Sequence, residues 1–97
     1  MRGDARVPYP LGVCQSGAYT ATAWRSAAVG AQTRAVLVSA STDAYYLFGD
    51  SGVTATSANG TFIPAGGEHY VRIPPGSYVS VVRVTADGTA HVSEMDG

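Results

Sequence analysis

Charge is the first thing that this sequence has little of. Only 13% of its 97 residues are charged, against roughly 25% in an average soluble protein. Lysine is absent, and the basic residues are scattered without forming a block, at Arg2, Arg6, Arg25, Arg34, Arg72 and Arg83. Nucleic-acid binding needs clustered positive charge to displace counterions from phosphates. This scatter and the net charge of -1 therefore argue against DNA or RNA as a partner.

Cysteine and long apolar runs are also scarce. The single cysteine, Cys14, cannot form an internal disulfide, and we expect it to be a small buried hydrophobe rather than a reactive thiol. Residues 1–10 hold no apolar run of the length that a signal peptide needs, and no stretch approaches the roughly 18 apolar residues of a membrane span. We expect a protein that is made and used without export and without a membrane partner.

Residues that carry chemistry are sparse as well. The candidates for acid and base catalysis are spread along the chain, and they are Asp43, Asp50, Glu68, His69, Asp87, His91 and Glu94. One cysteine and two distant histidines do not have the spacing of a metal site. Neither a Gly-x-Ser-x-Gly nucleophile elbow nor a phosphate loop with Gly-Lys-Ser/Thr occurs. We predict that the protein is not an enzyme and has no catalytic residues, metal or cofactor.

What the sequence does have is a 45% share of hydrophobic residues in a length that suits one small domain. With so few charges, much of the surface must consist of serine, threonine, alanine and glycine. Such a surface has few ions to desolvate when it is buried against neighbours, so the composition favours oligomerisation. The alternative is a monomer whose alanine and glycine reflect the codon bias of a GC-rich genome.

The first 19 residues hold glycine or proline at five positions and few long apolar side chains. Proline fixes the backbone and removes a donor, while glycine raises chain entropy, so a long helix is excluded. We expect residues 1–19 to form an extended N-terminal arm that lies across a neighbouring subunit, and residues 20–97 to form the folded domain. The partner-contacting residues expected here are Val7, Tyr9, Leu11, Val13, Tyr19 and Trp24.

Alternation with a period of two, together with β-branched and aromatic runs, predicts strands along most of the remaining chain. The expected strands are residues 20–26, 34–41, 43–48, 68–73, 77–85 and 88–95, with a short edge strand at 53–56. Glycine, proline, asparagine and aspartate separate them, and no segment has a convincing helical pattern. Short strands spaced in this way predict an all-β fold, a single β-sandwich or jelly-roll-like domain.

The last two predicted strands meet at Asp87-Gly88, where the turn type sets their register. A two-residue turn would mix polar and apolar side chains on both faces of the hairpin. A type I turn followed by a glycine bulge instead pairs Thr85 with Thr89 and makes one face apolar. We therefore predict a bulged β-hairpin. Its core-facing residues are Val82, Val84, Ala90 and Val92, and its outward-facing residues are Arg83 and His91.

Four tyrosines leave a second kind of site open. Tyr45, Tyr46, Tyr70 and Tyr78 would line a carbohydrate or peptide site if they gathered on one exposed face. Tyrosine is equally common on half-buried strands and in subunit interfaces. We favour the core or interface interpretation over a sugar site.

The order of turns and strands gives the chain a resemblance to a known group of proteins. A strand ends in Leu-Phe-Gly-Asp at residues 47–50, Phe-Ile-Pro-Ala-Gly-Gly-Glu follows at 62–68, and Tyr-Val-Arg-Ile-Pro-Pro-Gly at 70–76. Tyr-Val-Ser-Val-Val at 78–82 and Asp-Gly-Thr at 87–89 then lead into Val-Ser-Glu-Met at 92–95. Over residues 34–95 this order resembles small all-β structural proteins of tailed bacteriophages.

The resemblance implies a virion component, most directly a capsid cement or decoration protein on the capsid surface. Such a protein would contact the major capsid protein at the joints between its subunits and would associate with itself, commonly as a homotrimer at local threefold positions. It would be made in the host cytoplasm. Two alternatives stay open: a head–tail connector or tail component, which would form a ring, and a carbohydrate-binding or adhesin-like module.

Overall fold

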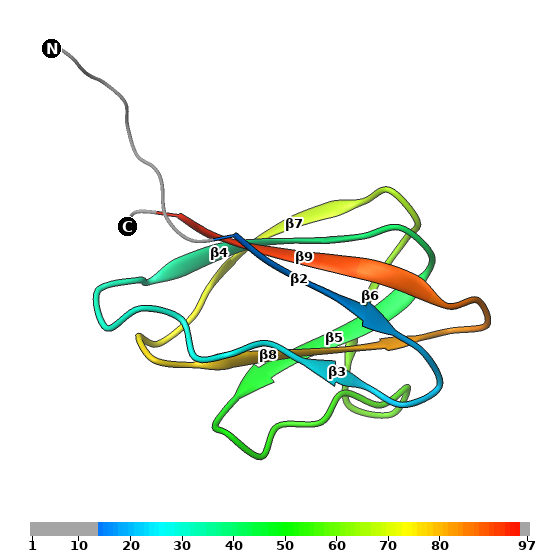
Figure 1. The fold of residues 1–97 in the computed structure, drawn as a ribbon, viewed down its shortest axis with the longest axis horizontal. Coiled ribbons are helices and arrows are strands. Elements are labelled where there is room, and N and C mark those ends of the chain that lie inside the picture. Colours follow the sequence, from blue (N-terminus) through cyan, green and yellow to red (C-terminus); the bar gives the residue numbers. More distant parts are fainter. Residues whose placement is uncertain (1–13, 96–97) are drawn as a thin grey trace, which may run out of the picture.

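The computed structural model describes residues 14–95, which form eight strands and no helix (Figure 1). The strands are β2 (Cys14–Tyr19), β3 (Trp24–Arg25), β4 (Ala35–Ala40), β5 (Ala44–Gly49), β6 (Thr61–Ile63), β7 (Glu68–Arg72), β8 (Tyr78–Arg83) and β9 (Gly88–Met95). They form two four-stranded antiparallel sheets. The first sheet has the order β2-β9-β4-β7 and the second has the order β3-β8-β5-β6. The prediction of an all-β fold is confirmed.

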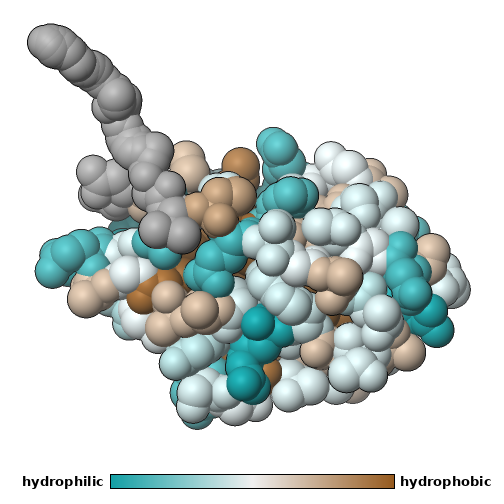
Figure 2. Space-filling model, in the orientation of Figure 1, coloured by the Kyte–Doolittle hydropathy of each residue, from teal (hydrophilic) through white to brown (hydrophobic). Residues whose placement is uncertain are grey.

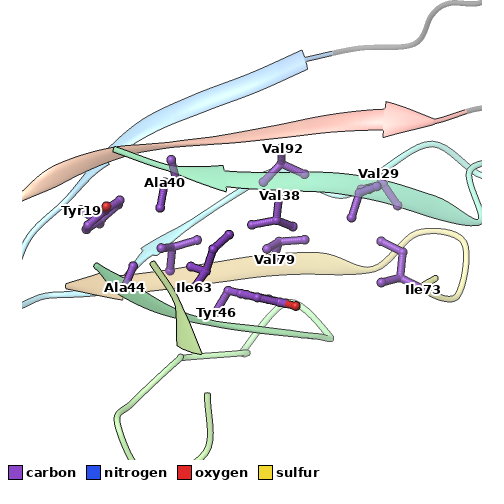
Figure 3. Close-up of a cluster of buried hydrophobic side chains, with 13 residues drawn as sticks. Tyr19, Val29, Val38, Ala40, Ala44, Tyr46, Ile63, Ile73, Val79 and Val92 are labelled. Carbon is purple, nitrogen blue, oxygen red and sulfur yellow. The ribbon is translucent and has the colours of Figure 1, made fainter. Parts of the chain in front are cut away.

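One hydrophobic core lies between the two sheets. Ala90 and Val92 of β9 are fully buried, whereas Thr89 and His91 are exposed, because successive residues of a strand point to opposite faces. In Figure 3 the side chains of both sheets point into the same space. The core consists of Tyr19, Val29, Val36, Val38, Ala40, Ala44, Tyr46, Ile63, Ile73, Val79, Val81, Ala90 and Val92. Most are β-branched, and such side chains pack well on pleated surfaces.

Most connections cross from one sheet to the other. Along residues 14–95, β5 and β6 are the only consecutive strands that belong to the same sheet. The crossing from β4 to β5 packs against the crossing from β8 to β9: Thr42 Oγ1 donates to the Ala86 carbonyl over 2.9 Å, and the Ser41 hydroxyl accepts the N–H of Thr89. The Tyr19 hydroxyl donates to the Thr42 carbonyl and joins β2 to the same place. These bonds fix one end of the molecule.

The predicted bulged hairpin between the last two strands is wrong. β8 pairs with β3 and β5, whereas β9 pairs with β2 and β4, so Val82 and Val92 lie in different sheets. Ala90 and Val92 do face the core and His91 is exposed. Val82 is buried but points to the outer side of its sheet, away from the core, and Val84 is 38% exposed in the connection. The turn residues also suit a crossing between sheets. In this arrangement β8 and β9 each pair with two neighbouring strands, whereas in an isolated hairpin each would pair with one.

The folded unit begins earlier than the predicted boundary at residue 20. Residues 14–19 pair along their whole length with β9, so this part of the predicted arm is an edge strand. Gly17 lies under the Trp24 indole, where an added Cβ would collide with Nε1. Glycine is needed here because another side chain approaches closely, and not because the backbone forms a loop. Residues 1–13 lie outside the described residues.

Three further local predictions differ from the structure. Cys14 is exposed instead of buried, since it lies on the solvent side at the start of β2. Within residues 20–26, only Trp24 and Arg25 form a strand, because the preceding residues make a turn in which Thr22 N–H donates to Thr20 Oγ1 over 3.0 Å. Residues 53–56 form no strand.

The connection between β5 and β6, residues 50–60, lies across the outer face of the second sheet. Ala55 N–H donates to the Ser80 hydroxyl over 2.9 Å, and both residues are buried. Thr56 N–H donates to Asn59 Oδ1 over 2.7 Å and shapes the turn. As a result β8 is buried on both faces from Val79 to Val82.

Candidate interaction surfaces

The outer face of the first sheet is open to solvent and carries little charge. Its exposed and half-buried residues follow from the strand registers, and we call this set the open face: Cys14, Ser16 and Ala18 of β2; Thr89, His91, Ser93 and Met95 of β9; Leu37 and Ser39 of β4; and Glu68, Tyr70 and Arg72 of β7. Ala35 of β4 points to the same side but is buried. Its charged residues are confined to β7, at one edge. The other three strands offer a surface that costs little to desolvate.

A row across the middle of the open face combines small, apolar and aromatic residues. Ser93 Oγ lies 3.3 Å from Cys14 Sγ, and Ser93 is also the register partner of Leu37. Leu37 is half-buried, and its partner Tyr70 on β7 is 61% exposed. An exposed tyrosine beside an aliphatic side chain has the composition of the central part of a protein interface, and the charges of Glu68 and Arg72 lie to either side of this tyrosine along β7.

An open groove of about 600 Å³ lies on the outer face of the second sheet, between residues 21–23 and the 50–60 segment. Tyr45 lines it and packs edge-on against Phe62, with ring centroids 6.0 Å apart. Arg83, the charged residue of the lining, is paired with Asp87 at 2.6 Å. The groove thus offers hydroxyl groups, one aromatic ring and a cation that is already neutralised by its own chain.

Tyr46 and His69 meet between the two sheets. Tyr46 is 6% exposed, and its hydroxyl lies 2.9 Å from His69 Nδ1, with the two rings edge-on. Burial raises the pKa of the Tyr46 phenol, because the charged phenolate would lose its hydration. The neighbouring Glu68 points to the other face of β7. The pair therefore connects edge strand β7 to the second sheet through a hydrogen bond of a neutral phenol.

The predicted partner-contacting residues fall into two groups. Val7, Tyr9, Leu11 and Val13 lie outside the described residues. Tyr19 is completely buried, so its side chain cannot meet a partner, and the prediction is wrong for this residue. Trp24 is half-buried and packs against the core. An aromatic residue at the end of a strand is equally common in a core and in an interface. Which of the two it occupies depends on how the strands pair, and the sequence alone does not give that pairing.

The four tyrosines do not gather on one face. Tyr46 points into the core and Tyr70 belongs to the open face. Tyr45 and Tyr78 share the outer side of the second sheet, but the register places them at opposite ends. The single exposed aromatic cluster that a sugar site requires is therefore not formed by these residues.

The open face itself was missed by the sequence analysis. Its signal was present as polar residues that alternate with buried ones, for example His91 and Ser93 on either side of Val92. That alternation shows that one face of a strand is exposed, but it does not show which exposed faces adjoin.

Among residues 14–95, the His, Cys, Asp and Glu side chains form no group of three or more that could hold a metal ion. A search of the same part of the chain finds no helix of the length and apolarity that crossing a membrane requires.

Comparison with known proteins identifies no relative. No family model matches the chain, and no curated protein or solved structure matches it either.

Proposed function

We propose that this protein is a non-catalytic structural component of a tailed-phage particle, a capsid cement or decoration protein that binds the major capsid protein on the head surface. In this proposal its two sheets are a jelly-roll-like β-sandwich. The observation that carries the proposal is the open face, which is four strands wide and uncharged on β2, β9 and β4.

Binding to a protein shell suits a surface of this kind. Removing ions from water is costly unless each one finds a partner, and the central strands of the open face present none. A paired sheet also loses little conformational freedom on binding, because its backbone is already ordered. Figure 2 shows that most residues on the displayed side of the molecule are pale, with separate strongly hydrophilic groups between them.

The row of Ser93, Leu37 and Tyr70 is the expected centre of the contact. Tyrosine supplies a large rigid contact area with few rotatable bonds, and the small side chains beside it allow a close approach. The groove on the second sheet is a weaker candidate for the contact, because its lining includes a segment that already stabilises the fold through Ser80.

Binding of purified protein to heads that lack it tests the proposal. Ser93→Arg places a charge in the middle of the open face, and we expect affinity to fall about tenfold or more, because an unpaired guanidinium must be buried. Ser51→Arg adds the same charge to the exposed turn after β5 and serves as the matched control, with binding within about twofold of wild type. Co-sedimentation with the heads measures both.

The possible results separate two parts of the proposal. If mass spectrometry of purified particles does not detect the chain, the virion role is wrong. If the chain is present and Ser93→Arg binds like wild type, the role stands and the open face is not the contact. A position at the head–tail joint instead of the head surface would identify a connector.

A further inference from the structure

Within residues 14–95 the first sheet has two edge strands, β2 and β7, and β7 lies at the upper margin of the molecule in Figure 1. β7 pairs with β4 on one side, and Ile73 N–H donates to the Arg34 carbonyl over 2.9 Å. Because hydrogen-bonded positions alternate in an antiparallel pair, residues 69, 71 and 73 direct their backbone groups to β4. The backbone groups of Glu68, Tyr70 and Arg72 therefore point away from the sheet.

The sequence of this edge is complementary to itself. Glu68 and Arg72 lie two residues on either side of Tyr70, and all three side chains are exposed on the open face. In an antiparallel pair with a second copy, centred on Tyr70, Glu68 of each copy lies opposite Arg72 of the other. Side chains directly opposite each other have Cβ atoms about 5 Å apart, which is within reach of an ion pair.

We propose that two copies of this chain pair edge to edge through β7, about a two-fold axis at Tyr70. The two four-stranded first sheets then form one continuous sheet. Glu68, Tyr70 and Arg72 have outward-pointing backbone groups, and they also form the three residue pairs across the axis. Tyr70 pairs with Tyr70 of the second copy, and Glu68 of each copy pairs with Arg72 of the other. Each of these pairs exchanges both its N–H and its C=O bonds.

The charges on β7 select this arrangement over others. Charged residues on an edge strand usually prevent pairing between sheets. Here the two charges are opposite in sign and equally distant from Tyr70, so antiparallel self-pairing in this register brings unlike charges together. Parallel pairing in register would place Glu68 beside Glu68 and Arg72 beside Arg72. The charge pattern therefore favours one geometry with a second copy and disfavours the parallel alternative.

The other described edges fit self-pairing less well. β3 has two residues and β6 has three, so their ladders are short. β2 is longer but carries no charge that would set a register. Its Gln15 side chain is bound to the backbone of Ala27, which accepts from Nε2 at 3.1 Å and donates to Oε1 at 2.7 Å.

A five-residue edge is a small contact, so we expect a weak dimer, with a dissociation constant on the order of micromolar or above. The pairing does not depend on the proposed virion role, since it is carried by the outward backbone groups of β7 and by the Glu68 and Arg72 charges. Tyr70 is the one residue that it shares with the row at the expected centre of the virion contact. A two-fold pair also differs from the homotrimer that the resemblance implies.

Charge reversal and charge exchange at the two ends of β7 test the pairing. Glu68→Arg or Arg72→Glu converts both ion pairs of the dimer into like-charge pairs, and we expect the dissociation constant to rise about tenfold or more. The double variant E68R/R72E restores unlike charges across the axis, and we expect a return to within about threefold of wild type. Arg25→Glu, an exposed reversal on β3, is the matched control and leaves the dimer unchanged.

Sedimentation equilibrium and native mass spectrometry of the full chain measure the association, and circular dichroism confirms that each variant is folded. A mass of two chains, with loss in the single variants and recovery in the double variant, supports the proposal. A chain that is only monomeric or trimeric at all concentrations overturns it. So does a dimer that the single reversals leave intact, or one that the charge exchange does not restore.

Discussion

The two sheets have the same number of strands but differ in what covers their outer faces. On the first sheet, β9 alternates between buried Val92 and exposed His91. On the second sheet, β8 is buried from Val79 to Val82 because the 50–60 segment lies over it. Within residues 14–95, the chain covers the outer face of the second sheet with its own 50–60 segment and has no such covering segment on the first. A partner of this protein is therefore expected on the first sheet.

The covering segment is held by a polar contact in a buried place. Ser80 is completely buried, and its hydroxyl accepts the N–H of Ala55. A buried N–H without a partner is costly, so the hydroxyl is required by the segment above it. The open face has no comparable requirement, because its polar side chains keep contact with water.

The largest expected effects come from shortening valines in β8 and β9. Val81→Ala and Val92→Ala remove core methyl groups, and we expect each to lower the free energy of unfolding by about 2 to 3 kcal/mol. Val82→Ala, under the covering segment, should cost about 1 to 2 kcal/mol, and Ser93→Ala on the open face less than about 0.5 kcal/mol. Urea unfolding measures all four. If Val82→Ala costs no more than Ser93→Ala, the second sheet is not covered in solution.

A smaller effect is expected from removing the hydroxyl beneath the covering segment. Ser80→Ala leaves the Ala55 N–H unpaired and should destabilise the protein by about 1 to 2 kcal/mol. Its matched control is Ser39→Ala on the open face, with a cost below about 0.5 kcal/mol. Hydrogen exchange provides a second readout, since the Ala55 amide should exchange faster in the Ser80 variant. Equal protection in both proteins would contradict the role assigned to this bond.

The smallest effect concerns the hydrogen bond that connects the two sheets at β7. The pKa of Tyr46 is raised above its ordinary value of 10.0, so the folded state holds its proton when the unfolded chain has begun to release it. This contribution to stability is complete below pH 10.0 and is lost as the pH rises through the folded-state value. Tyr46→Phe should lower the free energy of unfolding by about 1 kcal/mol at neutral pH. Above pH 10.0 the free energy of unfolding should fall less steeply with pH in this variant than in wild type. Identical alkaline slopes in urea unfolding would argue against it.

Local patterns predicted several elements well. The alternation over residues 88–95 identified a strand and its core-facing residues, Ala90 and Val92. Pro74-Pro75-Gly76 was expected to end a strand, and β7 ends at Arg72, with Gly76 in the left-handed region at φ 77°. In such places the backbone preference of a few adjacent residues is enough to decide the conformation.

The failures share a dependence on distant residues. Gly17 suggested an arm, but it is the position over which Trp24 packs. The Asp87-Gly88 turn suggested a hairpin, but the strands on either side of it belong to different sheets. Nothing near Ser80 in the sequence indicates that residue 55 lies above it. Each of these features forms between two segments that are not adjacent in the sequence.

By itself, the sequence determined that this protein is built from strands and which side chains alternate toward a core, because that alternation is a property of consecutive residues. Tertiary structure alone decided which strands adjoin, which outer face is covered and which edge is free. Those features depend on contacts between residues that are far apart in the chain. Many strand pairings are compatible with the same local alternation, and the packing of the complete domain selects one of them.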